Sequence, residues 1–295
     1  MAEARDVVPD LHADIARLER TLAALDGTAP LAFLGDLIDA GATDGAPDDA
    51  AVLARVRALT GTGRAVAVMG NHELNAILYH AEGPDGRPLR AHDAKNRRQH
   101  ASFLDAFGTG TPAAREWTEW FLTLPLWLDL GGLRLVHACW SPADIALIAA
   151  RRPDGRLRPA DLPEVADEAS PLGRAVRVLL TGPELPLPRG RSFTDRSGHR
   201  RGHARIAWWR EDARSWRDLA LSVPDPDALP EGGPPPGEAP PLYDAPPPVL
   251  VGHYKMAGPP RLESRYAACL DYPSTPCAYR WRGEAELAAA HLLRP

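Results

Sequence analysis

Short apolar runs, each ending in a cluster of polar residues, are the main pattern of this chain. Five of them indicate buried strands, because they are rich in Val, Leu and Ala and stop at Gly, Pro or His. These runs are Asp6–Val8, Leu31–Leu34, Ala65–Met69, Leu133–Val136 and Val249–Val251. Helix-compatible segments over 14–25 and 48–60 separate the first three runs, with Asp14 and Asp48 as expected N-caps. The first part of the chain therefore predicts a β-α-β-α-β unit of an α/β fold.

In the rest of the chain, the predicted helices and strands are spaced less regularly. We expect a helix over 162–180 and strands over 266–270, 278–281 and 286–289. Between them, 11 of the 31 prolines fall in residues 223–248. Proline lacks an amide donor and has a fixed φ, so we interpret this stretch as an extended surface loop.

Length and charge narrow the class of protein. The 295 residues, 44% of them hydrophobic and 25% charged, are enough for one large domain. A net charge of −5 argues against binding to bulk nucleic acid or to anionic membranes. No apolar run approaches the roughly 20 residues of a membrane span, and the first residues lack the apolar core of a secretion signal. The three cysteines form no disulfide framework, so we expect a reducing, cytoplasmic location.

The polar clusters provide the first argument about chemistry. Ligands of α/β sheets gather outside the carboxyl ends of the strands, so we expect these clusters to meet at one edge of the sheet. The candidates are Asp10, His12, Asp36, Asn71, His137 and His253. Oxygen and imidazole groups without a thiolate suit Mn²⁺, Fe or Zn²⁺. Asp10 and His12 lie two positions apart on an extended segment and could bind one ion, and Asp36 could bridge two.

Five motifs occur in a fixed order along the chain: DLH (10–12), GDLID (35–39), GNHE (70–73), HA (137–138) and GHY (252–254). In this order they resemble the calcineurin-like metallophosphoesterase superfamily. Within it, they are similar to a bacterial, phosphoprotein-phosphatase-like branch that includes protein Ser/Thr phosphatases and symmetrical diadenosine tetraphosphatases. The resemblance implies a four-layer α/β/β/α sandwich with two mixed sheets and a single domain over 1–295. A cap or loop region of about 141–248, containing the Pro-rich loop 223–248, would be inserted in it.

The resemblance also implies a role for each motif residue. Asp10 and His12 would bind one divalent ion, Asp36 would bridge, and the second ion would be held by Asn71, His137 and His253. A hydroxide between the ions would attack phosphorus in line, and His72, oriented by Asp39, would protonate the leaving oxygen. An imidazole beside a carboxylate stays protonated near neutral pH, which suits that role. The expected activity is hydrolysis of a phosphoric ester, with Mn²⁺ the first choice of metal and Fe or Zn²⁺ as alternatives.

Three positions depart from the family pattern. Pro9 and Ala13 stand where relatives carry Gly, which restricts the first turn. Ala40 stands where many relatives carry an Arg that forks onto the phosphate. Either another cation replaces it or phosphomonoesters bind weakly. The candidate cations are Arg200, Arg201 and Arg205, followed by Arg196, Arg97 and Arg98.

These departures leave three functions open. The substrate could be a phosphomonoester (a small molecule, a nucleotide or a phosphoprotein). It could instead be a phosphodiester or a nucleoside polyphosphate cleaved at the same site. In the third case, the chain is a regulatory module that binds metal without turnover.

Other polar residues receive plainer interpretations. Six histidines lie outside the motifs, and we expect them to be solvated or hydrogen-bonded structural residues: His80, His92, His100, His199, His203 and His291. We interpret Glu73 as a helix cap or a neighbour of the ligands. Asp271 either orients a ligand histidine or ends a strand.

Overall fold

The first sheet has the strand order β14-β13-β1-β2-β3 in the computed structural model, which describes residues 3–40, 45–195, 198–235 and 242–295. Strands β1 (Arg5–Val8), β2 (Leu31–Phe33) and β3 (Ala65–Ala67) are parallel. Strand β13 (Ala278–Trp281) pairs antiparallel with β1 and with β14 (Leu292–Leu293). The predicted β-α-β-α-β unit is confirmed by the three parallel strands.

The second sheet has the order β12-β11-β5-β4. Strands β5 (Arg134–Val136), β11 (Val249–Val251) and β12 (Ala267–Cys269) are parallel, and β4 (Trp127–Asp129) pairs antiparallel with β5. Both sheets are therefore mixed, as predicted.

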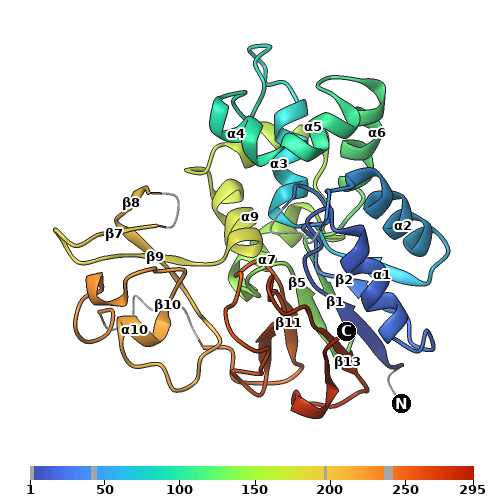
Figure 1. Ribbon diagram of the computed structural model, residues 1–295. Coiled ribbons are helices and arrows are strands. Elements are labelled where there is room, and N and C mark those ends of the chain that lie inside the picture. Colours follow the sequence, from blue (N-terminus) through green and yellow to red (C-terminus); the bar gives the residue numbers. More distant parts are fainter. Residues whose placement is uncertain (1–2, 41–44, 196–197, 236–241) are drawn as a thin grey trace.

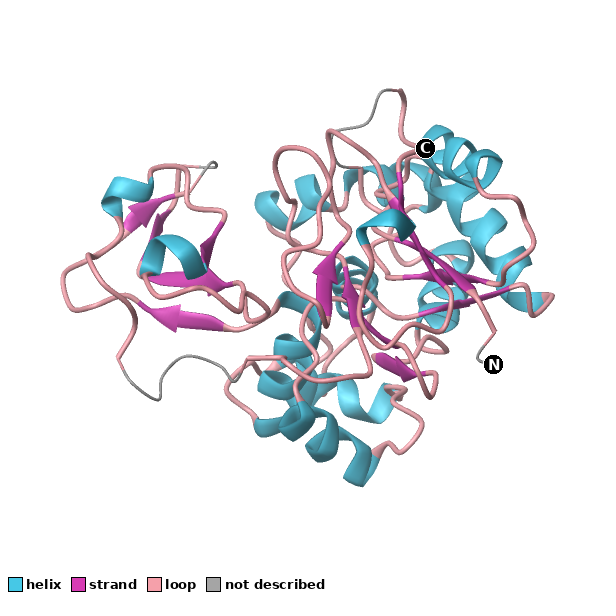
Figure 2. Ribbon diagram, turned by 90° about the horizontal axis from the view of Figure 1, so that it is seen from below, coloured by secondary structure: helices cyan, strands magenta, loops and turns pink. Residues whose placement is uncertain are grey.

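Alternating side chains of the strands point into two apolar layers. Val7 and Ala32 of the first sheet share one buried cluster with Leu135 and Leu250 of the second, so the sheets pack face to face. The alternate residues face the helices in another cluster, which includes Phe33 and Val251. Figure 2 shows the strands at the centre with helices around them. This arrangement confirms the predicted α/β fold with two mixed sheets.

Helices α1 (Ile15–Ala24) and α2 (Asp49–Gly61) begin at the expected caps. The side chain of Asp14 accepts from the Arg17 amide at 2.8 Å, and that of Asp48 from the Ala51 amide at 2.8 Å. These caps satisfy amides that have no partner in a first helical turn. Figure 1 shows both helices beside β1 and β2.

Most other helices follow the third strand or the fifth. They are α3 (Asn71–His80), α4 (Ala94–Gln99), α5 (Ala101–Phe107), α6 (Pro112–Phe121), α7 (Pro142–Arg151), the 3₁₀ helix η1 (Pro159–Asp161), α8 (Leu162–Ala166) and α9 (Pro171–Thr181). The prediction of one helix over 162–180 is wrong. A new helix begins within it, because Ser170 accepts from the Gly173 amide at 2.8 Å and Pro171 follows it in the first turn. Within the described ranges, no helix is long and apolar enough to cross a bilayer.

The region 141–248 has two different halves. Its helices pack into the main core through residues such as Ile148 and Leu179. Its second half forms a small lobe with a core of its own around Phe193, Ile206 and Trp216, visible at one side of Figures 1 and 2. The lobe contains β6 (Glu184–Pro186), β7 (Phe193–Thr194), β8 (Arg200–Arg201), β9 (His203–Ile206), α10 (Trp216–Leu219), β10 (Ala220–Leu221) and the 3₁₀ helix η2 (Pro226–Ala228). Residues 236–241 of the predicted Pro-rich loop lie outside the described residues.

The C-terminal predictions hold for two strands of three. Strands over 266–270 and 278–281 are confirmed by β12 and β13. The prediction of a strand over 286–289 is wrong, and a 3₁₀ helix, η3 (Ala289–His291), begins at the end of this segment. The backbone amides of this segment bond elsewhere: Leu287 N donates to Arg265 O at 2.7 Å and Ala288 N to Tyr279 Oη at 2.9 Å. These amides are therefore not available to a neighbouring strand.

Candidate metal centre

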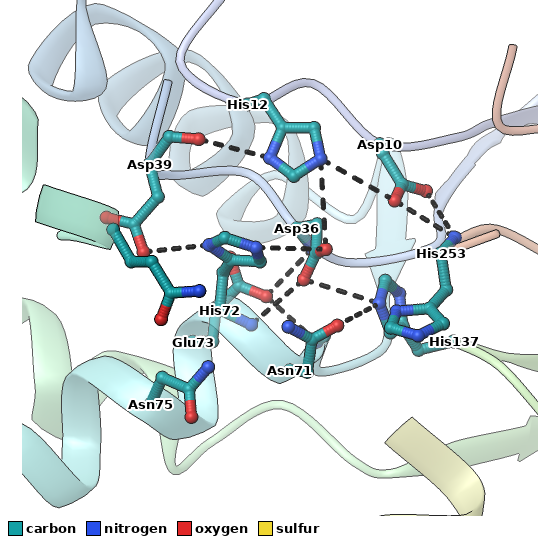
Figure 3. A network of polar contacts seen from close by, with 12 residues as sticks. Asp10, His12, Asp36, Asp39, Asn71, His72, Glu73, Asn75, His137 and His253 are labelled. Carbon is teal, nitrogen blue, oxygen red and sulfur yellow. Dashed lines mark hydrogen bonds and ion pairs between the residues drawn. The ribbon is translucent and has the colours of Figure 1, made fainter. Parts of the chain in front are cut away.

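The motif residues of both sheets meet in one place, shown in Figure 3. Asp10, Asp36 and Asn71 follow β1, β2 and β3 of the first sheet, whereas His137 and His253 follow β5 and β11 of the second. The prediction that all of them lie at the edge of one sheet is therefore wrong. The candidate site instead lies where the carboxyl ends of strands from two sheets come together.

Left-handed backbone conformations are concentrated at this site. The φ angles of His12, Asp36, Asp39 and His253 are 48°, 49°, 64° and 72°. Non-glycine residues in this region cost on the order of 1 kcal/mol or more each and persist where the surroundings enforce them. These turns direct the side chains toward one another. The backbone at the site is therefore strained where it presents the polar groups.

Two glycines allow the loops to approach closely. A Cβ on Gly252 would lie 1.9 Å from Asp10 Oδ1, and one on Gly70 would lie 2.3 Å from Asp36 N. Because Gly252 has no side chain, the next amide, His253 N, reaches Asp10 Oδ2 at 3.0 Å. The GH pair thus brings the two sheets into hydrogen-bond contact, and the glycine of the GN pair lets the loops after β2 and β3 approach each other.

Two groups of side chains could each hold a metal ion, and they share Asp36. His12, Asp36 and His72 form one group, and Asp36, His137 and His253 the other, with the ligand atoms of each within 4.8 Å of one another. Asn71 Oδ1 lies 3.1 Å from His137 Nε2, next to the second group. Asp10 Oδ2 lies 4.0 Å from His12 Nε2, next to the first. The structure thus brings all six predicted metal ligands together around one carboxylate.

The hydrogen bonds of the histidines leave ligand atoms free to face the cluster. His12 Nδ1 contacts Asp39 O at 3.1 Å, and His137 Nδ1 contacts Leu34 O at 2.7 Å. The Nε2 atoms of His12 and His253 are buried and have no hydrogen-bond partner among the described residues. Backbone contacts to one ring nitrogen are the usual way in which a protein orients a metal-binding histidine through the other. The residues present therefore fit divalent metal ions.

Burial sets the charge state of two of these histidines. It lowers the pKa of His12 to about 3, assisted by the neighbouring His72, and it holds the pKa of His253 well below its ordinary value. Both rings are consequently neutral, the form that binds a metal. Burial would raise the pKa of Asp36, but His137 and His72 outweigh it and hold that pKa well below its usual value. Asp36 is thus the negative charge at the centre of the cluster.

His72 and Asp39 form a pair at the edge of the cluster. His72 Nδ1 lies 2.8 Å from Asp39 Oδ2, and its Nε2 lies 3.8 Å from Asp36 Oδ2. Burial would lower the pKa of His72, but Asp36 and Asp39 outweigh it and raise this pKa to about 9. The imidazole is therefore protonated at neutral pH and has a proton on Nε2 to donate.

Two buried carboxylates hold the loops without belonging to either group. Glu73 accepts backbone N–H bonds from Asp36 at 2.9 Å, Leu37 at 2.8 Å and Gly70 at 2.8 Å. Asp271 accepts from Lys255 N at 2.7 Å and fixes the turn after His253. Glu73 thus caps α3 and ties it to the turn that carries Asp36.

The calcineurin-like phosphoesterase family model matches residues 6–170, more than half of the chain. The chain belongs to this family. Membership implies divalent metal ions at the site, in agreement with the two side-chain groups.

Other known proteins are similar over parts of the chain. A symmetrical bis(5'-nucleosyl)-tetraphosphatase from Ralstonia nicotianae (strain ATCC BAA-1114 / GMI1000) is 33% identical over 146 residues, 48% of this chain and 45% of that protein. The chain thus matches less than half the length of this relative. A cold-active protein-tyrosine phosphatase of a Shewanella species has a TM-score of 0.49 and 13% identity, covering 95% of this chain and 75% of that one. A protein serine/threonine phosphatase from Saccharomyces cerevisiae has a TM-score of 0.47 and 12% identity, covering 100% and 79%.

The positions that depart from the phosphoesterase family have defined environments. Ala13 occupies a left-handed turn with φ of 62°, where glycine is the unstrained residue. Ala40 N donates to Ser102 Oγ at 3.0 Å, and its methyl side chain contributes no cation. Arg97 and Arg98 lie exposed on α4, and Arg196 lies outside the described residues.

Cationic side chains nevertheless lie near the cluster of potential metal ligands. A cleft of about 820 Å³ lies between the small lobe and the turn after His253. Among the residues that line it are Arg200, Arg201, Arg205 and Lys255. The charge of Arg205, after burial, contributes to the low pKa of His253, and the charge of Lys255 contributes to that of His12. Lys255 was missed in the sequence, although it follows the GH motif by two positions and is one of two lysines in the chain.

Proposed function

We propose that this chain hydrolyses phosphoric esters with two divalent metal ions at the Asp36 cluster. The observation that carries this proposal is that potential metal ligands from both sheets surround one carboxylate, Asp36, with the hydrogen-bonded pair of His72 and Asp39 at their edge. Family membership supports it. Two bound ions would polarise the phosphoryl oxygens and activate a water, which is the chemistry that two-metal sites supply.

The ligand assignment follows from position around Asp36. Asp10, His12 and Asp36 would hold one ion, and the other would be held by Asp36, Asn71, His137 and His253. A set of carboxylate, amide and imidazole groups without thiolate favours Mn²⁺, with Fe and Zn²⁺ as alternatives. The cluster thus offers each ion ligands from different strand ends.

His72 would act as the general acid. Asp39 accepts the Nδ1 proton, so the Nε2 proton of His72 is the one directed into the cluster. An alkoxide leaving group is expelled far more easily when a positioned acid protonates it. Asp39 would keep the ring in this orientation and stabilise its positive charge.

Arg205 and Lys255 would hold the substrate phosphate in place of the arginine that Ala40 lacks. Both line the cleft beside the cluster, and Arg205 Nε is buried without a hydrogen-bond partner among the described residues. Arg200 and Arg201 line the same cleft, where their Nε atoms donate to Ser192 Oγ and Asp195 Oδ2 at 2.7 Å each. Arg200 and Arg201 would contact the part of the substrate beyond the reacting phosphate.

The test is hydrolysis of p-nitrophenyl phosphate and its bis-ester by the purified protein with Mn²⁺. We expect His72→Asn to lower kcat at least about 100-fold, the usual contribution of a general acid. Asp36→Asn should lower it at least as much, because it removes the ligand that both ions share. His291→Asn is the matched control, because His291 bonds to Glu284 outside the site. A metal-loaded protein inert on mono-, di- and pyrophosphate esters would refute the proposal and favour the metal-binding regulatory module.

One observation favours a longer substrate within this activity. The cleft beside the turn after His253 is lined by several cations, so it suits a chain of phosphates better than a single phosphoryl group. The name of the Ralstonia relative points to the same class, nucleoside polyphosphates. Rates on a dinucleoside tetraphosphate and on a phosphopeptide, compared for wild type and Arg201→Gln, would separate the two substrates. A loss confined to the polyphosphate supports the longer substrate.

A further inference from the structure

Asp39 is bound by two histidines, of which the second has no place in the family motifs. Its Oδ2 lies 2.8 Å from His72 Nδ1, and its Oδ1 lies 2.7 Å from His100 Nδ1. A carboxylate has two acceptor oxygens, and each oxygen of Asp39 is within hydrogen-bond distance of one of these rings. His72, Asp39 and His100 therefore form a continuous chain of side chains.

His100 is a rigid donor. It is buried between α4 and α5, with 4% of its surface exposed, and its ring stacks on Phe103 with centroids 4.6 Å apart and planes 15° apart. The second nitrogen, Nε2, is buried and has no hydrogen-bond partner among the described residues. Packing alone does not favour such a ring, because an apolar side chain would avoid the cost of this unsatisfied atom. The bond to Asp39 is the contact that an apolar side chain of the same size would lose.

The backbone at Asp39 is held by side chains of two helices, α2 and α5. Asp39 N donates to Asp49 Oδ1 at 2.9 Å, and the next amide, Ala40 N, donates to Ser102 Oγ at 3.0 Å. The main chain is thus fixed, while the terminal torsion of an aspartate is broad and allows its carboxylate plane to turn. The hydrogen bond from His100 stops this rotation.

We infer that His100 is a positioning residue that fixes the Asp39 carboxylate and, through it, the proton-donating ring of His72. This inference rests on the proposed function, because it assigns His100 to the general acid of that reaction. His100 touches neither the ligand groups nor the cleft, so its loss should leave metal content unchanged. Its effect should depend on how much the leaving group needs a proton.

The variants separate this role from a merely structural one. His100→Phe keeps the stacking on Phe103 and removes the donor, whereas His100→Asn restores a donor close to the position of Nδ1. His80→Phe is the control, because the His80 ring lies 5.6 Å from that of His100 between centroids and its Nδ1 accepts from Gly110 N rather than contacting Asp39. The substrates are phenyl phosphate, which expels a poor leaving group, and p-nitrophenyl phosphate, which expels a more acidic phenol.

With Mn²⁺, we expect His100→Phe to lower kcat about 10- to 100-fold on phenyl phosphate and by a several-fold smaller factor on p-nitrophenyl phosphate. His100→Asn should recover most of this loss, and His80→Phe should behave as wild type. Equal losses of His100→Phe on both substrates, or none, would overturn the inference.

Nuclear magnetic resonance provides a readout that does not depend on activity. In metal-free wild type, the Nδ1 protons of His72 and His100 should both give strongly downfield signals. In His100→Phe, the His100 signal should be absent and the His72 signal should be broadened. In His100→Asn, the His72 signal should stay sharp. A His72 signal unchanged in His100→Phe would overturn the inference. If the wild type hydrolyses neither ester while these signals behave as expected, the proposed function fails and the positioning by His100 stands.

Discussion

Glu73→Gln is the perturbation for which the structure gives the clearest expectation. Both carboxylate oxygens of Glu73 are used: Oε2 accepts from the amides of Asp36 and Gly70, and Oε1 accepts from Leu37 N. Glutamine can keep two of these bonds through its oxygen, but its NH₂ group then faces Leu37 N, donor against donor. The buried Leu37 amide is left without an acceptor.

The magnitude follows from the hydrogen bonds. An unsatisfied buried amide costs about 1–3 kcal/mol, and the two remaining bonds weaken because their acceptor loses its charge. Burial and repulsion by Asp36 raise the pKa of Glu73 to about 6, and relief of this repulsion offsets part of the cost. We expect the free energy of unfolding to fall by about 2 kcal/mol. We also expect kcat to fall about 100-fold, because the turn that carries Asp36 shifts.

Urea unfolding of the metal-free protein measures the first effect, and hydrolysis of p-nitrophenyl phosphate with Mn²⁺ measures the second. Glu82→Gln is the matched control, since Glu82 is exposed just beyond the end of α3, and its change should stay within about 0.5 kcal/mol. A Glu73→Gln variant as stable and as active as this control would refute the reasoning.

Three further predictions concern the rest of the fold. Hydrogen bonds from Arg152 and from the Arg158 amide outweigh burial and lower the pKa of Asp161 below 3.8. This carboxylate therefore stabilises the fold above that pH. Asp161→Asn should cost about 1–3 kcal/mol at pH 7 in urea unfolding, and the difference should shrink as the pH falls below about 4. Burial raises the thiol pKa of Cys139 and Cys269, and that of Cys277 to about 12, so a thiol reagent should label none of the three until the protein unfolds. Ala13→Gly should raise the thermal midpoint slightly, because it removes a left-handed alanine, and a lowered midpoint would contradict this account of the first turn.

Local chemistry explains which elements could be predicted from the sequence. The caps at Asp14 and Asp48 and the Val- and Leu-rich runs act within a few residues, so the first helices and strands follow from neighbouring positions. The break at Ser170–Pro171 carries the same kind of signal, a cap followed by a proline in the first turn, and could have been found. The segment 286–289 could not, because its amides bond to Arg265 and Tyr279, which lie elsewhere in the chain.

The residues of the candidate site also fall into those that could be predicted from the sequence and those that could not. Residues within motifs, such as Asp36 and His72, could be named because their order along the chain is distinctive. His100 carries no such pattern, and only tertiary contacts bring it to Asp39. Lys255 could have been found, because it follows the GH motif by two positions. The sequence also favoured a single sheet edge, because it does not show that β5 and β11 pair with each other rather than with β1.

Because the potential ligands come from two sheets, metal binding at the site depends on how these sheets pack. His137 and His253 reach the shared Asp36 from the second sheet, and they can do so only while the layer that contains Val7 and Leu250 is packed. An ion bound by ligands of both sheets therefore favours the packed arrangement, since it binds the folded chain and not the unfolded one. At a concentration 100 times its dissociation constant, such an ion stabilises the fold by about 2.7 kcal/mol. Metal affinity and the packing of the two sheets are thus coupled through Asp36.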